Sequence, residues 1–184
     1  GGGSLADFLE DWIDAVGIRI VNAYGMTECS PAIAGRGLDC EIHGTLGHPV
    51  VHTDLRIVSE DGEILPAGTE GLIEVRGPQV TIGYDNNEGE TEKAFTADGY
   101  LKTGDLGMLT MNNEVVITGR AKDIIVLASG ENIDPSRIES TITMFPFIED
   151  AVLVGQDRKG LGALLVPNHD ELKGWVEKTF SHIR

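Results

Sequence analysis

The sequence predicts an α+β fold in three regions. Residues 1–43 read as the end of an α/β domain, residues 44–119 as an antiparallel β-barrel-like subdomain, and residues 120–184 as a small C-terminal α+β domain. Two observations predict this order: brief β-rich runs separated by turn residues fill the middle of the chain, and helical periodicity occurs at both ends. An apolar content of 41% is sufficient for packed cores.

The first region predicts one helix and one short buried strand. Apolar residues recur at helical spacing over residues 5–16, and Ser4 is a suitable N-cap for that helix. The apolar run over residues 18–21 predicts a strand that leads into the polar turn Tyr24-Gly25-Met26-Thr27-Glu28. An open α/β sheet usually binds its ligand at such a strand end, so this turn is a candidate site.

The middle region predicts antiparallel strands joined by hairpin turns. Asp61-Gly62 and Asn112-Asn113 have the composition of hairpin turns, and one helix is expected near residues 90–95. The expected strands are Leu55 to Val58, Leu72 to Val75, Leu101 to Thr103, Leu106 to Thr110 and Val115 to Thr118.

The last region predicts alternating strands and helices after a border at about Arg120. A strand is expected over residues 124–127, and a helix that begins with Asp134 as N-cap and Pro135 at its first position. The inner face of that helix is predicted to carry Ile138, Ile142 and Phe145. Two further strands and a final helix follow, over residues 151–154, 163–166 and about 172–180.

Charge and cysteine content exclude several classes of partner. With 30 acidic and 14 basic residues the formal charge is -16, which repels nucleic acid and anionic lipid. Two cysteines are too few for a disulfide framework, so a reducing cytoplasm is the expected compartment. No apolar run reaches membrane-spanning length, so the sequence predicts no integral membrane segment and at most a peripheral association with a membrane.

One stretch of the chain is rich in cysteine and histidine, but the sequence does not predict a metal site there. The stretch contains Cys29, Cys40, His43, His48 and His52. Apart from His48 and His52 themselves, these residues lack the paired spacing of known zinc sites.

Three later motifs strengthen the candidate site at residues 24–28. They are Thr103-Gly104-Asp105, the run Gly119 to Asp123, and the run Ser129 to Ile133. Each motif alone is equally well a turn aspartate, an exposed charged pair or a left-handed turn glycine. In this order and spacing they resemble the adenylate-forming (AMP-binding) superfamily, and within it the C-terminal part of acyl-CoA synthetases. Residues 124–130 and 163–167 are most similar to the long-chain fatty acyl-CoA ligases.

The resemblance implies an enzyme that uses ATP, Mg²⁺ and CoA. It would activate a carboxylic acid, most simply a long-chain fatty acid, as acyl-adenylate with release of pyrophosphate, and then form the acyl-CoA and AMP. Thr27 would contact the phosphate and Glu28 would hold Mg²⁺, so these two residues are the candidate catalytic pair. The ATP and AMP site implied by the family comprises Tyr24, Gly25, Met26, Thr27, Asp105 and Arg120.

The same resemblance gives distinct roles to these residues and to two positions beyond Arg120. Asp105 is a carboxylate on a tight turn, which suits a bidentate grip on ribose hydroxyls, and Arg120 would contact ribose or phosphate. Lys122 would be the hinge about which the small C-terminal domain swings. Gly130 would line the tunnel for the pantetheine arm of CoA.

Two family motifs have no counterpart in this sequence. One is the Ser/Thr/Gly-rich phosphate loop of the N-terminal portion, and the other is a late lysine after a glycine, because Lys173-Gly174 has the reverse order. The chain is therefore expected to be a fragment, inactive without the missing N-terminal portion of the enzyme and prone to self-association. One alternative is a non-catalytic nucleotide-binding or interaction module. Another is a ligase for aryl, medium-chain or amino acids, or a ligase whose acyl acceptor is the phosphopantetheine of a carrier protein.

Overall fold

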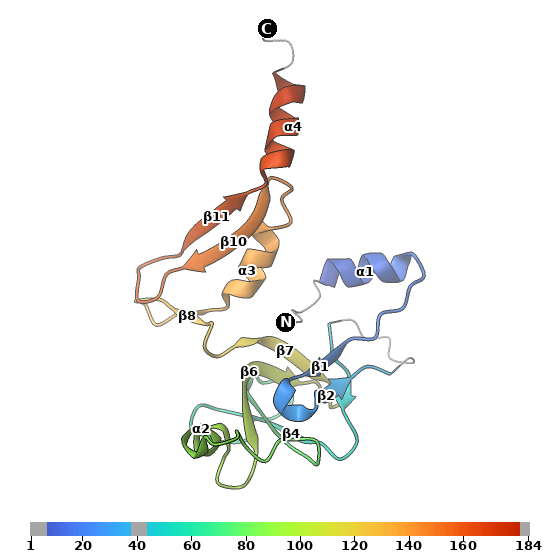
Figure 1. Ribbon diagram of the computed structural model, residues 1–184, viewed down its shortest axis with the longest axis vertical. Coiled ribbons are helices and arrows are strands. Elements are labelled where there is room, and N and C mark those ends of the chain that lie inside the picture. Colours follow the sequence, from blue (N-terminus) through green and yellow to red (C-terminus); the bar gives the residue numbers. More distant parts are fainter. Residues whose placement is uncertain (1–6, 38–43, 181–184) are drawn as a thin grey trace. The chain divides into compact units, whose positions relative to one another are not determined.

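The computed structural model describes residues 7–37 and 44–180 (Figure 1). The chain divides into two compact units, the first unit Gly1–Ala121 and the second unit Lys122–Arg184. The predicted N-cap Ser4 and the residues Cys40 and His43 lie outside the described residues. The three-region division expected from the sequence stays a prediction.

The first unit begins with the expected helix, α1 Asp7–Ala15, but its burial differs from the expected pattern. Trp12 is 64% exposed, whereas Glu10 is only 4% exposed. The reason is an ion pair between the Glu10 carboxylate and the Arg36 guanidinium, both of which are buried. Arg36 Nε also donates to the Thr45 carbonyl oxygen at 2.7 Å, so a charged pair fastens α1 to the segment that follows it.

The strand predicted over residues 18–21 is wrong by position. β1 spans Ala23–Gly25 and pairs with β2 Ala32–Gly35, which in turn pairs with β3 His48–Pro49, all antiparallel. Among the described residues, no strand lies opposite residues 18–21, and Ile18 is 61% exposed. A β-rich run becomes a strand only where a partner supplies hydrogen bonds, and β2 supplies them two residues later.

The middle of the chain forms an antiparallel sheet, as expected, although the sheet is open rather than a closed barrel. Its strands are β4 Asp54–Val58, β5 Gly71–Arg76, β6 Leu101–Leu109 and β7 Val115–Arg120, in that order. The two runs predicted at Leu101 and Leu106 are one strand, with register irregularities near Gly104. Helix α2 Glu88–Ala94 confirms the helix expected near residues 90–95.

The structure confirms both predicted hairpin turns. Gly62 has φ +83° and Asn113 has φ 64°, the left-handed conformations that glycine and asparagine adopt most readily. The sheet encloses a core that also receives residues from the loop after β1. Its buried members are Cys29, Ile33, Ile57, Ile73, Val75 and Leu101.

The second unit contains a helix packed on a hairpin, and Figure 1 shows α3 beside β10. Its elements are β8 Ile125–Val126, β9 Asn132–Ile133, α3 Pro135–Ile142, β10 Ile148–Val154, β11 Gly162–Pro167 and α4 His169–Thr179. Asp134 caps α3 as predicted, since its carboxylate accepts from Ser136 N at 3.0 Å. Phe145 does not share the inner face of α3: the helix ends at Ile142, and Phe145 is 61% exposed.

Within residues 7–37 and 44–180, no helix combines the length and the apolar character that crossing a membrane requires.

Candidate functional site

The loop after β1 is held in one conformation by its own backbone. Met26 N donates to the Pro31 carbonyl oxygen at 2.8 Å, and residues Thr27–Cys29 form a single 3₁₀ turn. A Cβ on Gly25 would lie 1.9 Å from the Pro31 oxygen, so only glycine fits where the two strands of this hairpin approach. The predicted turn therefore has a fixed shape, and glycine at this position is a requirement of packing.

Tyr24 and Asp105 form a direct contact between two predicted site residues. The Tyr24 hydroxyl donates to Asp105 Oδ2 at 2.5 Å, although 81 positions separate them in the sequence. Asp105 is only 7% exposed. Burial, and then the hydrogen bond to Asp105, raise the pKa of Tyr24 well above its ordinary value. The phenol therefore stays protonated at neutral pH and donates a hydrogen bond to the carboxylate.

Arg120 reaches the other oxygen of the same carboxylate. Asp105 and Arg120 lie opposite each other in the β6–β7 pair, and Arg120 Nε donates to Asp105 Oδ1 at 3.1 Å. The Arg120 side chain is 71% exposed, so most of the guanidinium faces solvent. A carboxylate has about four acceptor positions, so each Asp105 oxygen can accept a further hydrogen bond.

The turn at Gly104 orients the Asp105 carboxylate. Asp105 N donates to Thr103 Oγ1 at 3.1 Å, and that hydroxyl donates to the Ile73 carbonyl oxygen at 2.9 Å. Gly104 has φ +77°, and its carbonyl oxygen accepts from Ala121 N at 3.0 Å. Strands β5, β6 and β7 therefore all contribute to the position of this one side chain.

Glu28 is placed by a residue that lies far from it in the sequence, Tyr84. The Tyr84 hydroxyl donates to Glu28 Oε1 at 2.9 Å. Thr81 N donates to the Glu28 carbonyl oxygen at 2.7 Å, so the segment before α2 holds both the backbone and the side chain. Because 56 positions separate Tyr84 from Glu28, no local sequence pattern indicates this contact.

Thr27 and Met26 complete the loop in different ways. Thr27 is exposed, and its hydroxyl makes no hydrogen bond within the described part of the chain. Met26 packs against the core cluster of the first unit. The loop thus presents one unengaged hydroxyl beside one half-engaged carboxylate.

One oxygen of the Glu28 carboxylate is a hard ligand of the kind that Mg²⁺ binds. Among the described residues, no group of three or more His, Cys, Asp or Glu side chains is arranged to hold a metal. Mg²⁺ in nucleotide sites usually takes one or two carboxylates, phosphate oxygens and water. Glu28 provides one hard carboxylate oxygen, Oε2, that is not engaged by Tyr84.

Lys122 and Gly130 belong to the second unit. Lys122 is the first residue of that unit and is exposed. Gly130 has φ +84°, and no atom lies within 4 Å of a Cβ built on it. The left-handed backbone conformation therefore favours glycine at this position, and there is open space around it.

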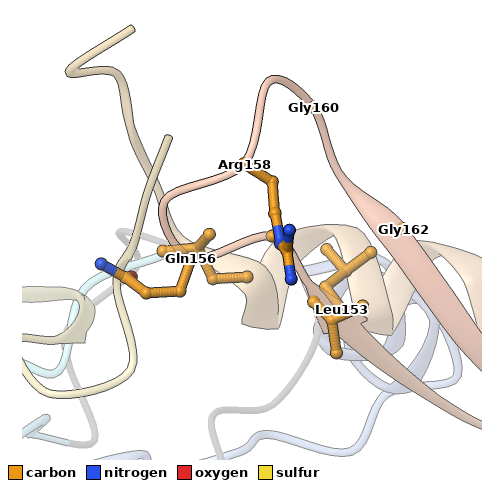
Figure 2. Close-up of a pocket in the computed structure, with 8 residues that line it drawn as sticks. Leu153, Gln156, Arg158, Gly160 and Gly162 are labelled. Carbon is orange, nitrogen blue, oxygen red and sulfur yellow. The ribbon is translucent and has the colours of Figure 1, made fainter. Parts of the chain in front are cut away.

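A pocket in the second unit was not predicted from the sequence. It has a volume of about 620 Å³ between the end of β10 and the loop before β11. Figure 2 shows the side chains of Arg158 and Leu153 pointing into the same space. Its lining residues are Ile125, Leu153, Val154, Gly155, Gln156, Arg158, Gly160 and Gly162.

Two family models match this chain. The model of the AMP-binding enzyme matches residues 1–85, and the model of the AMP-binding enzyme C-terminal domain matches residues 122–183. Both units therefore match parts of one enzyme family.

Curated relatives include fatty acyl ligases. The chain is 40% identical over 93% of its length to a chloroplastic long-chain-fatty-acid–[acyl-carrier-protein] ligase, AEE15, of Arabidopsis thaliana, and covers 25% of it. It is 38% identical over 97% of its length to the long-chain-fatty-acid–CoA ligase FadD15 of Mycobacterium bovis, and covers 28% of it. The chain thus spans about a quarter of the length of these relatives.

A solved structure shares the fold. The O-succinylbenzoate coenzyme A synthetase (MenE) of Bacillus subtilis, in complex with ATP and magnesium ion, has a TM-score of 0.80 and 31% identity. The match covers 96% of this chain and 38% of that one.

Proposed function

Because the chain belongs to the AMP-binding family of adenylate-forming enzymes, we propose that it is part of an ATP-dependent ligase for long-chain fatty acids. The enzyme would activate the acid as acyl-adenylate, release pyrophosphate, and transfer the acyl group to the thiol of CoA. The observation that carries the proposal is the Asp105 carboxylate, which Tyr24 and Arg120 hold in the middle of β6. The names of the similar ligases support the choice of acid.

In this proposal Asp105 binds the ribose of ATP. Its two oxygens are fixed by a phenol and a guanidinium, and their remaining acceptor positions suit two adjacent hydroxyl groups. Arg120 supplies a permanent positive charge beside the carboxylate, for ribose or phosphate oxygens. The fixed loop of Tyr24, Gly25 and Met26 would lie against the adenine.

Thr27 and Glu28 are the proposed catalytic residues of the adenylation step. The exposed Thr27 hydroxyl would donate to an α-phosphate oxygen, and Glu28 would hold Mg²⁺ through a carboxylate oxygen. Mg²⁺ held there would supply positive charge that offsets the charge of the phosphates when the acid attacks the α-phosphate and pyrophosphate leaves. Local donors matter here because the formal charge of -16 opposes binding of an anion such as ATP.

Lys122 is the proposed hinge between the adenylating and thioester-forming arrangements. The border between the two compact units lies between Ala121 and Lys122. This border supports a hinge at Lys122, because hinges change their backbone dihedral angles where two compact units meet. Gly130 is proposed to admit the pantetheine arm of CoA, and its position in an exposed turn is compatible with that role.

A carrier-protein phosphopantetheine is the second candidate for the thiol acceptor. The 40% identity to the chloroplastic acyl-carrier-protein ligase favours it. We further propose that the 184-residue chain cannot form acyl-adenylate alone, because its sequence contains neither the phosphate loop nor the late lysine.

ATP–pyrophosphate exchange tests the proposal. It would be measured on the 184-residue chain and on the longest product of its gene, with palmitate, benzoate and acetate offered separately. Exchange by the long product alone, strongest with palmitate, is the expected result. Exchange by neither protein would favour a non-catalytic nucleotide-binding or interaction module.

Asp105→Asn in the long product tests the ribose contact. Exchange should require about tenfold more ATP, because a charged acceptor is replaced by a neutral amide at a cost of about 1.4 kcal/mol. Asp54→Asn is the matched control, because Asp54 also accepts from a tyrosine, Tyr100, at 2.5 Å and from an arginine, Arg76, at 2.9 Å. Equal effects of the two substitutions would contradict the proposed role of Asp105.

A further inference from the structure

We propose that Tyr84 is a positioning residue that holds the Glu28 carboxylate in place for the metal and the phosphates of ATP. The inference rests on the proposed function, in which Glu28 holds Mg²⁺. The Tyr84 hydroxyl donates to Glu28 Oε1 at 2.9 Å. This contact fixes the side-chain torsions of Glu28 and leaves Oε2 as the oxygen available to a cation.

The segment that carries Tyr84 is also bonded to the backbone of the Glu28 loop. Thr81 N donates to the Glu28 carbonyl oxygen at 2.7 Å. The Thr81 hydroxyl accepts from Gly83 N at 3.3 Å and lies 3.1 Å from the Gly83 carbonyl oxygen, which folds the chain back toward Tyr84. Glu28 is therefore held at two points, its carbonyl group and its carboxylate, by residues four positions or fewer apart.

Helix α2 fixes Tyr84 from the opposite side. Tyr84 N donates to Thr91 Oγ1 at 2.9 Å, and Asn87 N donates to the Tyr84 carbonyl oxygen at 3.2 Å. Gly83 has φ +148°, and a Cβ on it would lie 2.6 Å from Thr91 Cγ2. This close approach brings the backbone of Tyr84 onto the helix and requires glycine at position 83.

Helix α2 supports the backbone of Tyr84. No residue of α2 is buried, and of its residues only Ala94 packs against the core cluster of the first unit. Its first turn is capped by Asn87, whose side chain accepts from Glu90 N at 3.3 Å. What the helix does hold is the Tyr84 backbone, and through it the phenol that reaches Glu28.

The chemistry of the pair suits a metal-binding carboxylate. A phenol donates a hydrogen bond without carrying a charge of its own. Tyr84 therefore acts on the orientation of the Glu28 carboxylate and leaves the charge of that carboxylate available to the metal.

The contact itself can be tested on the 184-residue chain without any substrate. The chain has three tyrosines, and ¹³C NMR of the ring Cζ atoms follows the titration of each, with Tyr84→Phe identifying the Tyr84 signal. Glu28→Gln should lower the titration midpoint of Tyr84 toward that of an ordinary tyrosine and leave Tyr100 unchanged. A Tyr84 midpoint that does not respond to Glu28→Gln would overturn the inference.

The positioning role is tested by the Mg²⁺ dependence of exchange in the long product. Tyr84→Phe should raise the Mg²⁺ concentration for half-maximal exchange roughly fivefold, as expected for one lost hydrogen bond. In a Glu28→Gln background the same change should have no further effect. Tyr100→Phe is the matched control, because it also removes a hydroxyl that donates to a carboxylate, that of Asp54.

The outcomes separate this inference from the proposed function. Exchange with an unchanged Mg²⁺ dependence in Tyr84→Phe would overturn the role of Tyr84 and leave the ligase intact. If Tyr100→Phe raised the Mg²⁺ concentration for half-maximal exchange equally, the effect of Tyr84→Phe would be one of general stability, and the positioning role of Tyr84 would be overturned. Absence of exchange with every acid counts against the ligase, whereas the tyrosine titration still decides the Tyr84–Glu28 contact.

Discussion

The two units of the chain differ in how completely they bury their apolar side chains. Ile33, Ile73 and Val75 of the first unit are 0% exposed, and they belong to a core of six buried residues. The second unit has three core residues, Ile125, Leu127 and Leu153, which are 7% to 9% exposed. Every residue of its strand β11 is exposed.

The difference follows the placement of the candidate site. Tyr24 packs against the core of the first unit, and Asp105 lies on β6, one of the inner strands of the four-stranded sheet. Side chains that must meet a nucleotide at fixed distances are best held by rigid elements. Within the second unit, the Trp175 ring contacts those of Phe147 and Phe180 edge to face, but all three side chains are at least 36% exposed.

The largest effect is expected from truncating the two cores. Ile73→Ala should lower the free energy of unfolding of the first unit by about 4 kcal/mol, and Leu153→Ala should lower that of the second by about 2 kcal/mol. The chain has two tryptophans, Trp12 and Trp175, one in each unit. Urea unfolding followed by fluorescence in Trp175→Phe and Trp12→Phe backgrounds therefore reports each unit separately. Equal losses would remove the contrast between the units.

The next effect concerns the buried ion pair of the first unit. Glu10→Ala should cost about 3 kcal/mol, because it leaves the Arg36 charge buried without its carboxylate. Trp12 fluorescence during urea unfolding measures the loss. The double variant Glu10→Leu with Arg36→Met should recover most of the stability, since an apolar pair of similar volume needs no charge compensation. Failure of the double variant to recover would show that the pair itself is needed.

A smaller effect is expected from pH. Burial, and then the charge of Glu28, raise the pKa of the Cys29 thiol from 9.0 to about 11. In the unfolded chain this thiol loses its proton first, so its contribution to stability is present below pH 9 and is lost as the pH rises toward 11. The free energy of unfolding should fall by about 1.3 kcal/mol more between pH 8 and pH 10 in the wild type than in Cys29→Ala. Parallel pH profiles of the two proteins would contradict it.

The smallest effect is expected on β11. Leu164 is 65% exposed, so Leu164→Ala should change the free energy of unfolding of the second unit by less than about 0.5 kcal/mol. Trp175 fluorescence during urea unfolding is the measurement. A cost near that of Leu153→Ala would mean that β11 is covered in solution, and light scattering would then show whether a second copy of the chain covers it.

Local sequence features predicted much of the fold. The turns at Gly62 and Asn113, the cap at Asp134 and the antiparallel strands follow from neighbouring residues, and the structure has them. Predictions failed where a distant partner decides. Residues 18–21 have strand composition, but β2 pairs with Ala23–Gly25 instead.

Long-range contacts account for what the sequence did not reveal about burial and the site. Glu10 is a charged residue of α1, and its burial is made favourable by an ion pair with Arg36, which is 26 positions away in the sequence. The motifs that contain Tyr24 and Asp105 are each visible in the sequence. Nothing near either motif indicates that the Tyr24 hydroxyl donates to the Asp105 carboxylate. The contact of Tyr84 with Glu28 was missed for the same reason.

The separation of 81 positions between Tyr24 and Asp105 also bears on synthesis of the chain at the ribosome. At roughly 5–20 residues per second, Tyr24 is made some 4–16 s before its acceptor exists. Throughout that interval the loop after β1 can close on Pro31, a neighbour already made, but its phenol has no carboxylate. The candidate nucleotide site is thus assembled by the last strands of the first unit to leave the ribosome, and a nascent chain halted before Asp105 has only half of it.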